Sequence, residues 1–303
     1  MSKRIIHISD LHIKGRTDQN THYFEQLLNC IFNESEIKPI IIITGDIFFI
    51  EGPTIYQPWY KEANRILKTF YDQKYSILPV PGNHEFTVFS EDDGIRHMEV
   101  AFHEYILEPN PINEIKIWPY PHFYPLDDHK IFFIGVNSVV RNGQRLKFAR
   151  GNIGEVQRNA VKNKLIEINN SKPDYVKILY LHHHPFYFGT SRKCCQTLID
   201  GNDFMKDIAD KGVDIMLFGH ENWHFHNNTG KIDKVNSGIK HILSCSDSTN
   251  PNGQKHQVDP SGFVSKECSQ EGCFGWEIEI DDRQNINITM LEFDLKNNVI
   301  IRR

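Results

Sequence analysis

The sequence lacks a long hydrophobic run. Its longest apolar stretch, residues 40–50, is interrupted by Thr44, Gly45 and Asp46, so no segment is predicted to span a membrane. No segment resembles a secretory leader, because residues 1–4 run directly into a predicted strand, so none is expected. We therefore expect a protein that has no membrane partner.

The sequence also lacks an excess of positive charge and a regular set of cysteines. Its formal net charge is −5, which argues against long nucleic acid as a partner, because proteins that bind many phosphates carry a basic surface. The six cysteines show no regular spacing in a chain of 303 residues. This predicts reduced thiols and a cytoplasmic location. No motif indicates an oligomeric state.

What the sequence does contain is a series of short polar clusters, each at the end of an apolar run. They are Asp10-Leu11-His12, Gly45-Asp46, Gly82-Asn83-His84-Glu85, His182-His183-His184-Pro185 and Gly219-His220-Glu221-Asn222. The preceding runs are predicted strands at residues 4–9, 39–44, 76–81, 175–181 and 213–218. Asp, His and Asn are the side chains that hold hard or borderline divalent metals. Loops at strand ends are where α/β proteins build their sites, so the clusters predict a metal centre.

The segments between the strands have helical periodicity. Apolar residues at spacings of three and four predict helices over residues 22–33, 53–71, 92–107, 153–168 and 200–211. Alternating strands and helices predict an α/β fold with a largely parallel sheet. Further strands are predicted at residues 130–136, 239–245, 274–280 and 286–293, and residues 246–272 are predicted to form a long loop.

The donor types within the clusters suit two metal ions better than one. Asp10 and His12 lie two residues apart just beyond a strand, so their side chains point the same way. A carboxylate such as that of Asp46 has two oxygens and can bridge two cations. Together with the amide oxygen of Asn83 and the imidazole nitrogens, this gives a mixed set able to hold two metals about 3.5–4 Å apart, the spacing used in phosphoryl transfer.

The motifs DLH, GD, GNHE, HHHP and GHEN, in this order, resemble those of the calcineurin-like metallophosphoesterase family. The resemblance extends from Asp10 to Asn222. Residues 150–157 and 181–185 are similar to the cyclic-nucleotide-phosphodiesterase-like branch of that family. The resemblance implies a four-layer α/β/β/α metallophosphoesterase sandwich. We expect one domain over residues 1–303, in which residues from about 230 to 303 add strands of the second sheet.

By the same resemblance, two divalent metal ions (Mn, Fe or Zn) are expected. The residues that match the family's ligands are Asp10, His12 and Asp46 for the first metal, and Asp46, Asn83, His182 and His220 for the second. Asp46 would bridge the metals, and a hydroxide shared by them would attack phosphorus. His182 directly follows its strand and is preferred to His183 as the ligand.

His84 is the residue that the resemblance places in catalysis. It would contact the phosphoryl oxygen or protonate the leaving alkoxide, and Glu85 or another carboxylate would orient it. Arg192, with its neighbour Lys193, could bind a substrate phosphate. The alternative for Arg192 is an ordinary solvated loop charge.

One position departs from the family's pattern. The last motif of the family usually reads Gly-His-x-His, and its second histidine completes the first metal site. Here that position is Asn222. Three alternatives follow: the Asn222 amide coordinates more weakly, His224 or His226 replaces it, or the first metal is held loosely. An amide oxygen in place of nitrogen would shift the preference toward a harder ion such as Mn²⁺.

These observations predict a metal-dependent phosphoric ester hydrolase. We expect a phosphodiesterase that hydrolyses a small, nucleotide-like phosphoester by attack of the metal-bridging hydroxide. The alternatives are an activity like that of the family's DNA-repair exonucleases, a protein phosphatase activity, or a scaffold that has lost its catalytic site. Asn222 is the residue that favours the scaffold, and His84 is the residue that argues against it.

Overall fold

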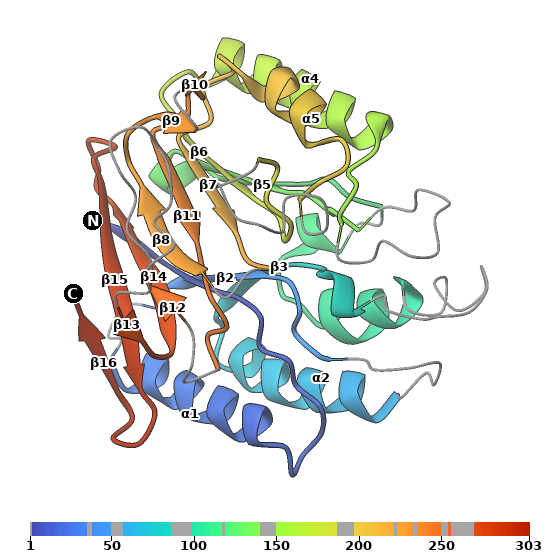
Figure 1. The fold of residues 1–303 in the computed structure, drawn as a ribbon, viewed down its shortest axis with the longest axis vertical. Coiled ribbons are helices and arrows are strands. Elements are labelled where there is room, and N and C mark those ends of the chain that lie inside the picture. The colour runs from blue at the N-terminus through green and yellow to red at the C-terminus, as the bar shows by residue number, and fades with distance from the viewer. Residues whose placement is uncertain are drawn as a thin grey trace.

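The computed structural model describes residues 2–34, 38–49, 57–85, 99–116, 119–139, 150–186, 197–220, 223–232, 235–249, 254–255 and 270–303. Two β-sheets face each other in the middle of the molecule, and helices cover the outer face of each sheet (Figure 1). This arrangement confirms the α/β/β/α sandwich predicted from the sequence. Within the described residues, no helix is both long and apolar enough to cross a bilayer.

The first sheet has six strands, and its outer face is covered by α1 and α2 (Figure 1). In spatial order its strands are β16 (Val299–Arg302), β15 (Ile286–Asp294), β14 (Phe274–Ile280), β1 (Lys3–Ile8), β2 (Ile40–Thr44) and β3 (Ser76–Val80). The helices are α1 (Gln19–Glu34) and α2 (Gln57–Asp72). Strands β1, β2 and β3 are parallel to one another. Their carboxyl ends therefore meet at one edge of the sheet.

The second sheet has eight strands, and its outer face is covered by α4 and α5 (Figure 1). Its strands are β13 (Gln270–Glu271), β12 (Gln254–Lys255), β8 (Trp223–Asn227), β11 (His241–Ser244), β7 (Ile215–Phe218), β6 (Val176–Tyr180), β5 (Ile131–Gly135) and β4 (His122–Leu126). The helices are α4 (Glu155–Ser171) and α5 (Gly201–Ile208). Strands β5, β6, β7 and β11 are parallel.

Short elements complete the description. They are the 3₁₀ turns η1 (Asn83–Glu85), η3 (Asn113–Ile115) and η4 (Asp127–His129), the π-helical turn η2 (His103–Leu107), and the paired strands β9 (Lys231–Ile232) and β10 (Val235–Asn236).

Strand residues alternate between two apolar cores. In β5, Ile131 and Phe133 belong to the core between the sheets, whereas Phe132 and Ile134 belong to the core under α4 and α5. This is the two-residue period of a strand whose two faces are both covered. Burial of both faces explains why these strands are continuous apolar runs in the sequence.

The predicted strands are confirmed to within two residues of their ends, and the described parts of the predicted helices to within about three. Seven strands were not predicted: β4, β8, β16 and the two-residue strands β9, β10, β12 and β13, of which β12 and β13 lie in the segment 246–272 predicted to be a loop. Strand β4 contains Pro125, and proline usually argues against a strand because it has no backbone N–H to donate. It is tolerated here because β4 lies at an edge of its sheet. Of the predicted helix at 92–107, only residues 99–107 are described; they form a helical turn and then the π-helical turn η2.

The carboxyl-terminal strands divide between the two sheets. Strands β11, β12 and β13 lie in the eight-stranded sheet, but β14, β15 and β16 extend the six-stranded sheet. The sequence predicts that residues from about 230 to 303 add strands to the second sheet. The difference arises because β14 pairs antiparallel with β1 along its length, for example Ile278 with Ile5.

Candidate metal centre

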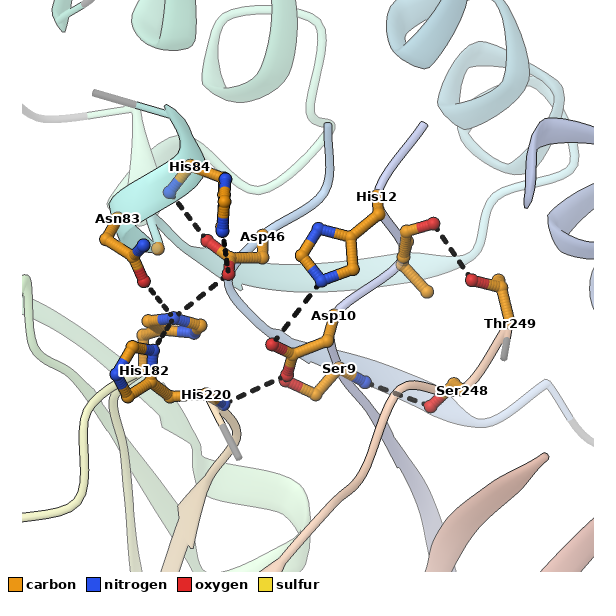
Figure 2. A network of polar contacts seen from close by, with 12 residues as sticks. Ser9, Asp10, His12, Asp46, Asn83, His84, His182, His220, Ser248 and Thr249 are labelled. Carbon is orange, nitrogen blue, oxygen red and sulfur yellow. Dashed lines mark hydrogen bonds and ion pairs between the residues drawn. The ribbon is translucent and has the colours of Figure 1, made fainter. Parts of the chain in front are cut away.

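The loops that follow the parallel strands of both sheets converge at one place. The structure brings together Asp10, His12, Asp46, Asn83, His84, His182 and His220 (Figure 2). The first five come from the six-stranded sheet, and the two histidines after them come from the eight-stranded sheet. The predicted residues Asn222 and Arg192 lie outside the described residues.

Four of these residues have a left-handed backbone, which non-glycine residues rarely adopt. The φ angles are 53° for Asp10, 49° for His12, 50° for Asp46 and 74° for His220. Such strain persists only where the surrounding structure holds it, and it concentrates at functional sites. Here backbone hydrogen bonds join the loops, with the His12 N–H donating to the carbonyl of Asp46 at 2.9 Å. The backbone is thus shaped to turn these side chains toward one point.

Two glycines make the close packing possible. A Cβ on Gly82 would lie 2.1 Å from Oδ1 of Asp46, and one on Gly219 would lie 2.4 Å from Oδ2 of Asp10. No larger residue fits at either position without displacing a carboxylate. The glycines of the GNHE and GHEN motifs therefore allow the backbone to lie close to the carboxylates of Asp46 and Asp10.

Asp46 lies at the centre of the site. Its Oδ1 accepts the backbone N–H of His84 at 2.8 Å, and its Oδ2 lies 3.3 Å from Nε2 of His182. Asp46 belongs to two clusters of possible metal ligands, one with Asp10 and His182 and the other with His12 and His84. Within each cluster the ligand atoms are no more than 4.8 Å apart. Asp46 is therefore positioned to be shared by two ions.

His182 is fully buried and held in one orientation. Its Nδ1 donates to the carbonyl of Thr44 at 2.7 Å, and its Nε2 lies 3.0 Å from Oδ1 of Asn83 and 3.1 Å from Nδ1 of His220. A carbonyl partner on Nδ1 leaves Nε2 available as a ligand atom. Burial alone would lower the pKa of His182, but the negative charge of Asp46 raises it to about 9.

His183, the alternative ligand, forms a cluster of possible metal ligands with His182 and His220 but makes different contacts. Its Nδ1 lies 2.9 Å from Oγ of Ser138, whereas its buried Nε2 has no hydrogen-bond partner among the described residues. The ring lies beside His220, with 4.2 Å between ring centroids. His182 contacts the carboxylate and the amide of the predicted second site, so the geometry favours His182 and leaves His183 beside it.

Asp10 and His12 form the other half of the centre. Oδ1 of Asp10 lies 4.0 Å from Nε2 of His12. Oδ2 of Asp10 accepts the backbone N–H of His220 at 3.0 Å and the hydroxyl of Ser9. Asp10 is thus held by one bond from its own strand end and one from the opposite sheet.

A third carboxylate, Asp247, lies against this half of the centre. Asp10, His12 and Asp247 form a further cluster of possible metal ligands. Burial raises the pKa of Asp10 well above its usual value; the charges of Asp46 and Asp247 add to this, and that of His182 opposes it. Sequence analysis missed Asp247 because it lies in a segment predicted to be a loop. The available signal was its position just after the apolar run 239–245, the same placement as the other clusters.

His84 faces the site with part of its ring exposed. Its Nε2 lies 4.0 Å from Oδ2 of Asp46, and 26% of the side chain is accessible. The ring stacks on Phe49, with 4.3 Å between centroids and 23° between planes, and meets the ring of His12 edge-on. A substrate can therefore reach the ring of His84, and the rings of Phe49 and His12 set the orientation of that ring.

Glu85 or another carboxylate was predicted to orient His84, and the contacts of Glu85 argue against the first alternative. One oxygen of Glu85 accepts the backbone N–H groups of Asp46 and Gly82 at 2.8 and 2.6 Å, and the other accepts that of Phe48 at 3.0 Å. Glu85 is fully buried. Its function is to fix the two loops that carry Asp46 and Asn83.

The histidines considered as substitutes for Asn222 lie in β8, away from the described ligand clusters. The ring of His224 is fully buried and stacks on Trp276, with 4.2 Å between centroids and 8° between planes. Nε2 of His226 lies 3.1 Å from Nδ1 of His241. Neither belongs to a described cluster of possible metal ligands, so the structure gives no support to either substitution.

The residues present fit divalent cations. Three carboxylates, those of Asp10, Asp46 and Asp247, are each at most 9% exposed and lie close together. Burying like charges in this way is costly unless a cation offsets them. The surrounding nitrogen and amide donors are those of transition-metal sites.

Fold and site together define a metal-binding α/β sandwich of the phosphoesterase class. The model of the calcineurin-like phosphoesterase family matches residues 3–223, and the chain belongs to that family. The family resemblance predicted from the sequence motifs is thereby confirmed.

One curated relative and one solved structure are similar to this chain. "Probable glycerophosphodiester phosphodiesterase GpdQ" of Arcobacter nitrofigilis is 26% identical over 226 residues, which cover 71% of this chain and 70% of the relative. The structure of GAP50, described as the anchor in the inner membrane complex of Plasmodium, matches with a TM-score of 0.55. It covers 99% of this chain and 87% of GAP50 at 16% identity. At that identity, the similarity to GAP50 concerns the fold alone.

Proposed function

We infer that this protein is a phosphodiesterase that depends on two divalent metal ions and hydrolyses a small, nucleotide-like phosphoester. The observation that carries this inference is the position of Asp46, which belongs to two ligand clusters at once. A second support is the relative from Arcobacter nitrofigilis, whose name describes a phosphodiesterase.

The proposed ligands are the residues that match the family's pattern, and the two clusters around Asp46 contain four of them, Asp10, His12, Asp46 and His182. Asp10, His12 and Asp46 would hold the first ion, and Asp46, Asn83, His182 and His220 would hold the second. When bound, two such ions lower the pKa of a water molecule and neutralise charge on the phosphoryl oxygens. Among the three candidate metals, the many oxygen donors favour Mn²⁺.

His84 is the proposed catalytic residue outside the ligand set. Its ring lies beside His12 and the shared carboxylate of Asp46, and its accessible edge can reach an oxygen of the substrate. It would donate a proton to the leaving alkoxide, a step that contributes about 10²–10⁴-fold to the rate in enzymes. Stacking on Phe49 keeps the ring in place for this transfer.

The chain's charge and cysteines support a small substrate and a reducing compartment. A net charge of −5 supplies no overall attraction for long nucleic acid. Among the described cysteines, Cys30, Cys245 and Cys273 are buried free thiols. We therefore propose a cytoplasmic enzyme.

Hydrolysis of bis(p-nitrophenyl) phosphate in Mn²⁺ tests the proposal directly. Wild-type protein should turn the diester over after metal loading, and Asp46→Asn should lose most of that activity. His84→Ala should also lose activity, with a larger loss on a diester that has an alkyl leaving group. Turnover that survives both substitutions would contradict the proposed mechanism. A wild-type chain that binds less than one tightly held ion and shows no Mn²⁺ activation would instead indicate the non-catalytic scaffold.

Substrate class is tested on the same preparation. Cyclic nucleotides, dinucleotides, phospholipid diesters and a monoester are compared by their kcat/KM values. A small diester should be preferred. Preference for single-stranded DNA would indicate the exonuclease-like activity, and preference for a phosphopeptide would indicate a protein phosphatase.

A further inference from the structure

Asp247 lies on the loop that follows β11, directly beside the Asp10 half of the site. Strand β11 is parallel to β7, with Ser244 opposite Phe218. The loops after these two strands therefore leave the sheet at the same edge. One of them carries His220 and the other carries Asp247.

Hydrogen bonds fasten this loop to the loop that bears Asp10 (Figure 2). The Ser248 N–H donates to the carbonyl of Ser9 at 3.0 Å, and the Ser9 N–H donates to Oγ of Ser248 at 3.1 Å. The hydroxyl of Thr249 donates to the carbonyl of Leu11 at 2.9 Å. Asp247 is consequently held in place next to Asp10, with 9% of its surface exposed.

The cluster that contains Asp247 is confined to the first metal half. Its other members are Asp10 and His12, the two residues proposed to bind the first ion without sharing it. The described clusters that include His182 or Asp46 do not include Asp247. Asp247 is therefore positioned to bind the first ion and not the second.

The spacing of these atoms suits one coordination sphere. Nitrogen and oxygen ligands lie about 2.0–2.2 Å from a first-row metal ion, so two ligands of one ion are at most about 4.4 Å apart. The ligand atoms of Asp10, His12 and Asp247 lie within 4.8 Å of one another. A shift of a few tenths of an ångström would bring them onto a common ion.

We propose that Asp247 is the fourth ligand of the first metal ion, in place of the histidine that the family usually has at position 222. This inference rests on the proposed function, because it assigns a residue to one of its two metal sites. The first site would then contain three carboxylates, from Asp10, Asp46 and Asp247, and one imidazole. The second site would contain one carboxylate, one amide and two imidazoles.

The two sites would accordingly differ in the ions they prefer. Carboxylate oxygens suit harder ions such as Mn²⁺, whereas imidazole suits borderline ions such as Zn²⁺. The first site also carries more negative charge than the second. We expect the first site to discriminate against Zn²⁺ in favour of Mn²⁺ more strongly than the second site does.

Mn²⁺ binding to the metal-free full chain tests the assignment without measuring turnover. Electron paramagnetic resonance reports the number of bound ions, their affinities and the spectrum of a coupled pair. Asp247→Asn keeps the size of the side chain and should retain one tight ion, weaken the other at least tenfold and abolish the coupled spectrum at low Mn²⁺ concentration. Asn222→Ala should retain both ions. Asp174→Asn, at an exposed ion pair at the opposite end of β6 from His182, is the matched control.

The possible results separate the two proposals. Equal binding of two ions by wild type and Asp247→Asn would overturn the role of Asp247 and leave the dinuclear site intact. Loss of the first ion in Asn222→Ala, but not in Asp247→Asn, would assign the site to Asn222. A wild-type chain without two bound ions would overturn the proposed function as well. If Asp247→Asn does not fold, Asp247→Glu replaces it, with a shift in Mn²⁺ affinity confined to one ion as the expected result.

Discussion

The two halves of the candidate metal centre are held by different means. In the second-metal half, side chains contact one another directly: His182 lies 3.0 Å from Asn83, 3.1 Å from His220 and 3.3 Å from Asp46. In the first-metal half, Asp10 and His12 are 4.0 Å apart. Left-handed backbone occurs in both halves, at Asp10, His12 and His220, but the first half depends more on hydrogen bonds between loops than on contacts between ligands.

This difference indicates unequal preorganisation of the two sites. Ligands that already touch through hydrogen bonds and an ion pair have little freedom left to lose when a metal binds, which favours affinity. Where loop geometry sets the positions of the ligands, those positions depend on every segment that holds the loops in place. We therefore expect the second-metal half to tolerate changes in its surroundings better than the first-metal half.

The largest expected effect comes from Asp46→Asn, because Asp46 links the two halves. An amide removes the negative charge that both ions would share. Both ions should be lost or weakened, and kcat/KM should fall at least about a thousandfold, equivalent to about 4 kcal/mol of transition-state stabilisation. Metal content by mass spectrometry and kinetics on bis(p-nitrophenyl) phosphate measure this. Two bound ions in the variant would show that Asp46 is not a bridge.

His84→Ala should separate catalysis from metal binding. We expect kcat to fall about 10²–10⁴-fold while both ions stay bound, because His84 donates a proton but holds no metal. The loss should be larger for an alkyl leaving group than for p-nitrophenolate, which needs little protonation. A variant that loses an ion, or loses the same factor on both substrates, would contradict this role.

The sequence was sufficient to predict which loops converge, but not every residue on them. Parallel strands with both faces buried are continuous apolar runs, and the polar residues that interrupt them mark the site, as at Asp10 and Asp46. Asp247 follows the same rule. It was missed because the Ser- and Asn-rich segment around it is typical of a solvated loop and matches no motif.

Roles that depend on distant contacts could not be predicted. Glu85 adjoins His84 in the sequence, yet its carboxylate is turned to backbone N–H groups of the Asp46 loop. The turn η1 sends neighbouring side chains in different directions, so adjacency was a poor guide. Similarly, only the pairing of β14 with β1 determines which sheet the last strands join.

His7 links β1 and β2, the strands that precede Asp10 and Asp46, and a fall in pH should weaken that link. Nε2 of His7, in β1, lies 2.9 Å from Oγ1 of Thr44, in β2. Burial lowers the pKa of His7 to about 3, so protonation favours the unfolded chain, whose histidine has a pKa of about 6.5. The stability due to neutral His7 is complete above pH 6.5 and is lost progressively as the pH falls from 6.5 toward 3.

His7→Gln tests this contribution in metal-free protein. Between pH 7 and pH 5, the free energy of unfolding of wild type should fall by about 2 kcal/mol more than that of the variant, which cannot titrate at this position. Urea unfolding at both pH values measures the difference. Equal losses in the two proteins would mean that His7 is not held neutral by burial.

The smallest expected effect concerns Phe49, which touches both a first-half ligand and the catalytic histidine. Its ring stacks on His84 and meets His12 edge-on at 5.3 Å, and Nζ of Lys14 lies 4.2 Å from its centroid. Phe49→Leu preserves bulk but removes the aromatic face, which is worth about 0.5–1.5 kcal/mol in such pairs. We expect kcat to fall by up to about tenfold with KM and metal content unchanged, and more for an alkyl leaving group than for p-nitrophenolate. That pattern would identify Phe49 as a positioning residue for His84. A change confined to Mn²⁺ affinity would show instead that Phe49 acts on His12, and hence on the first-metal half.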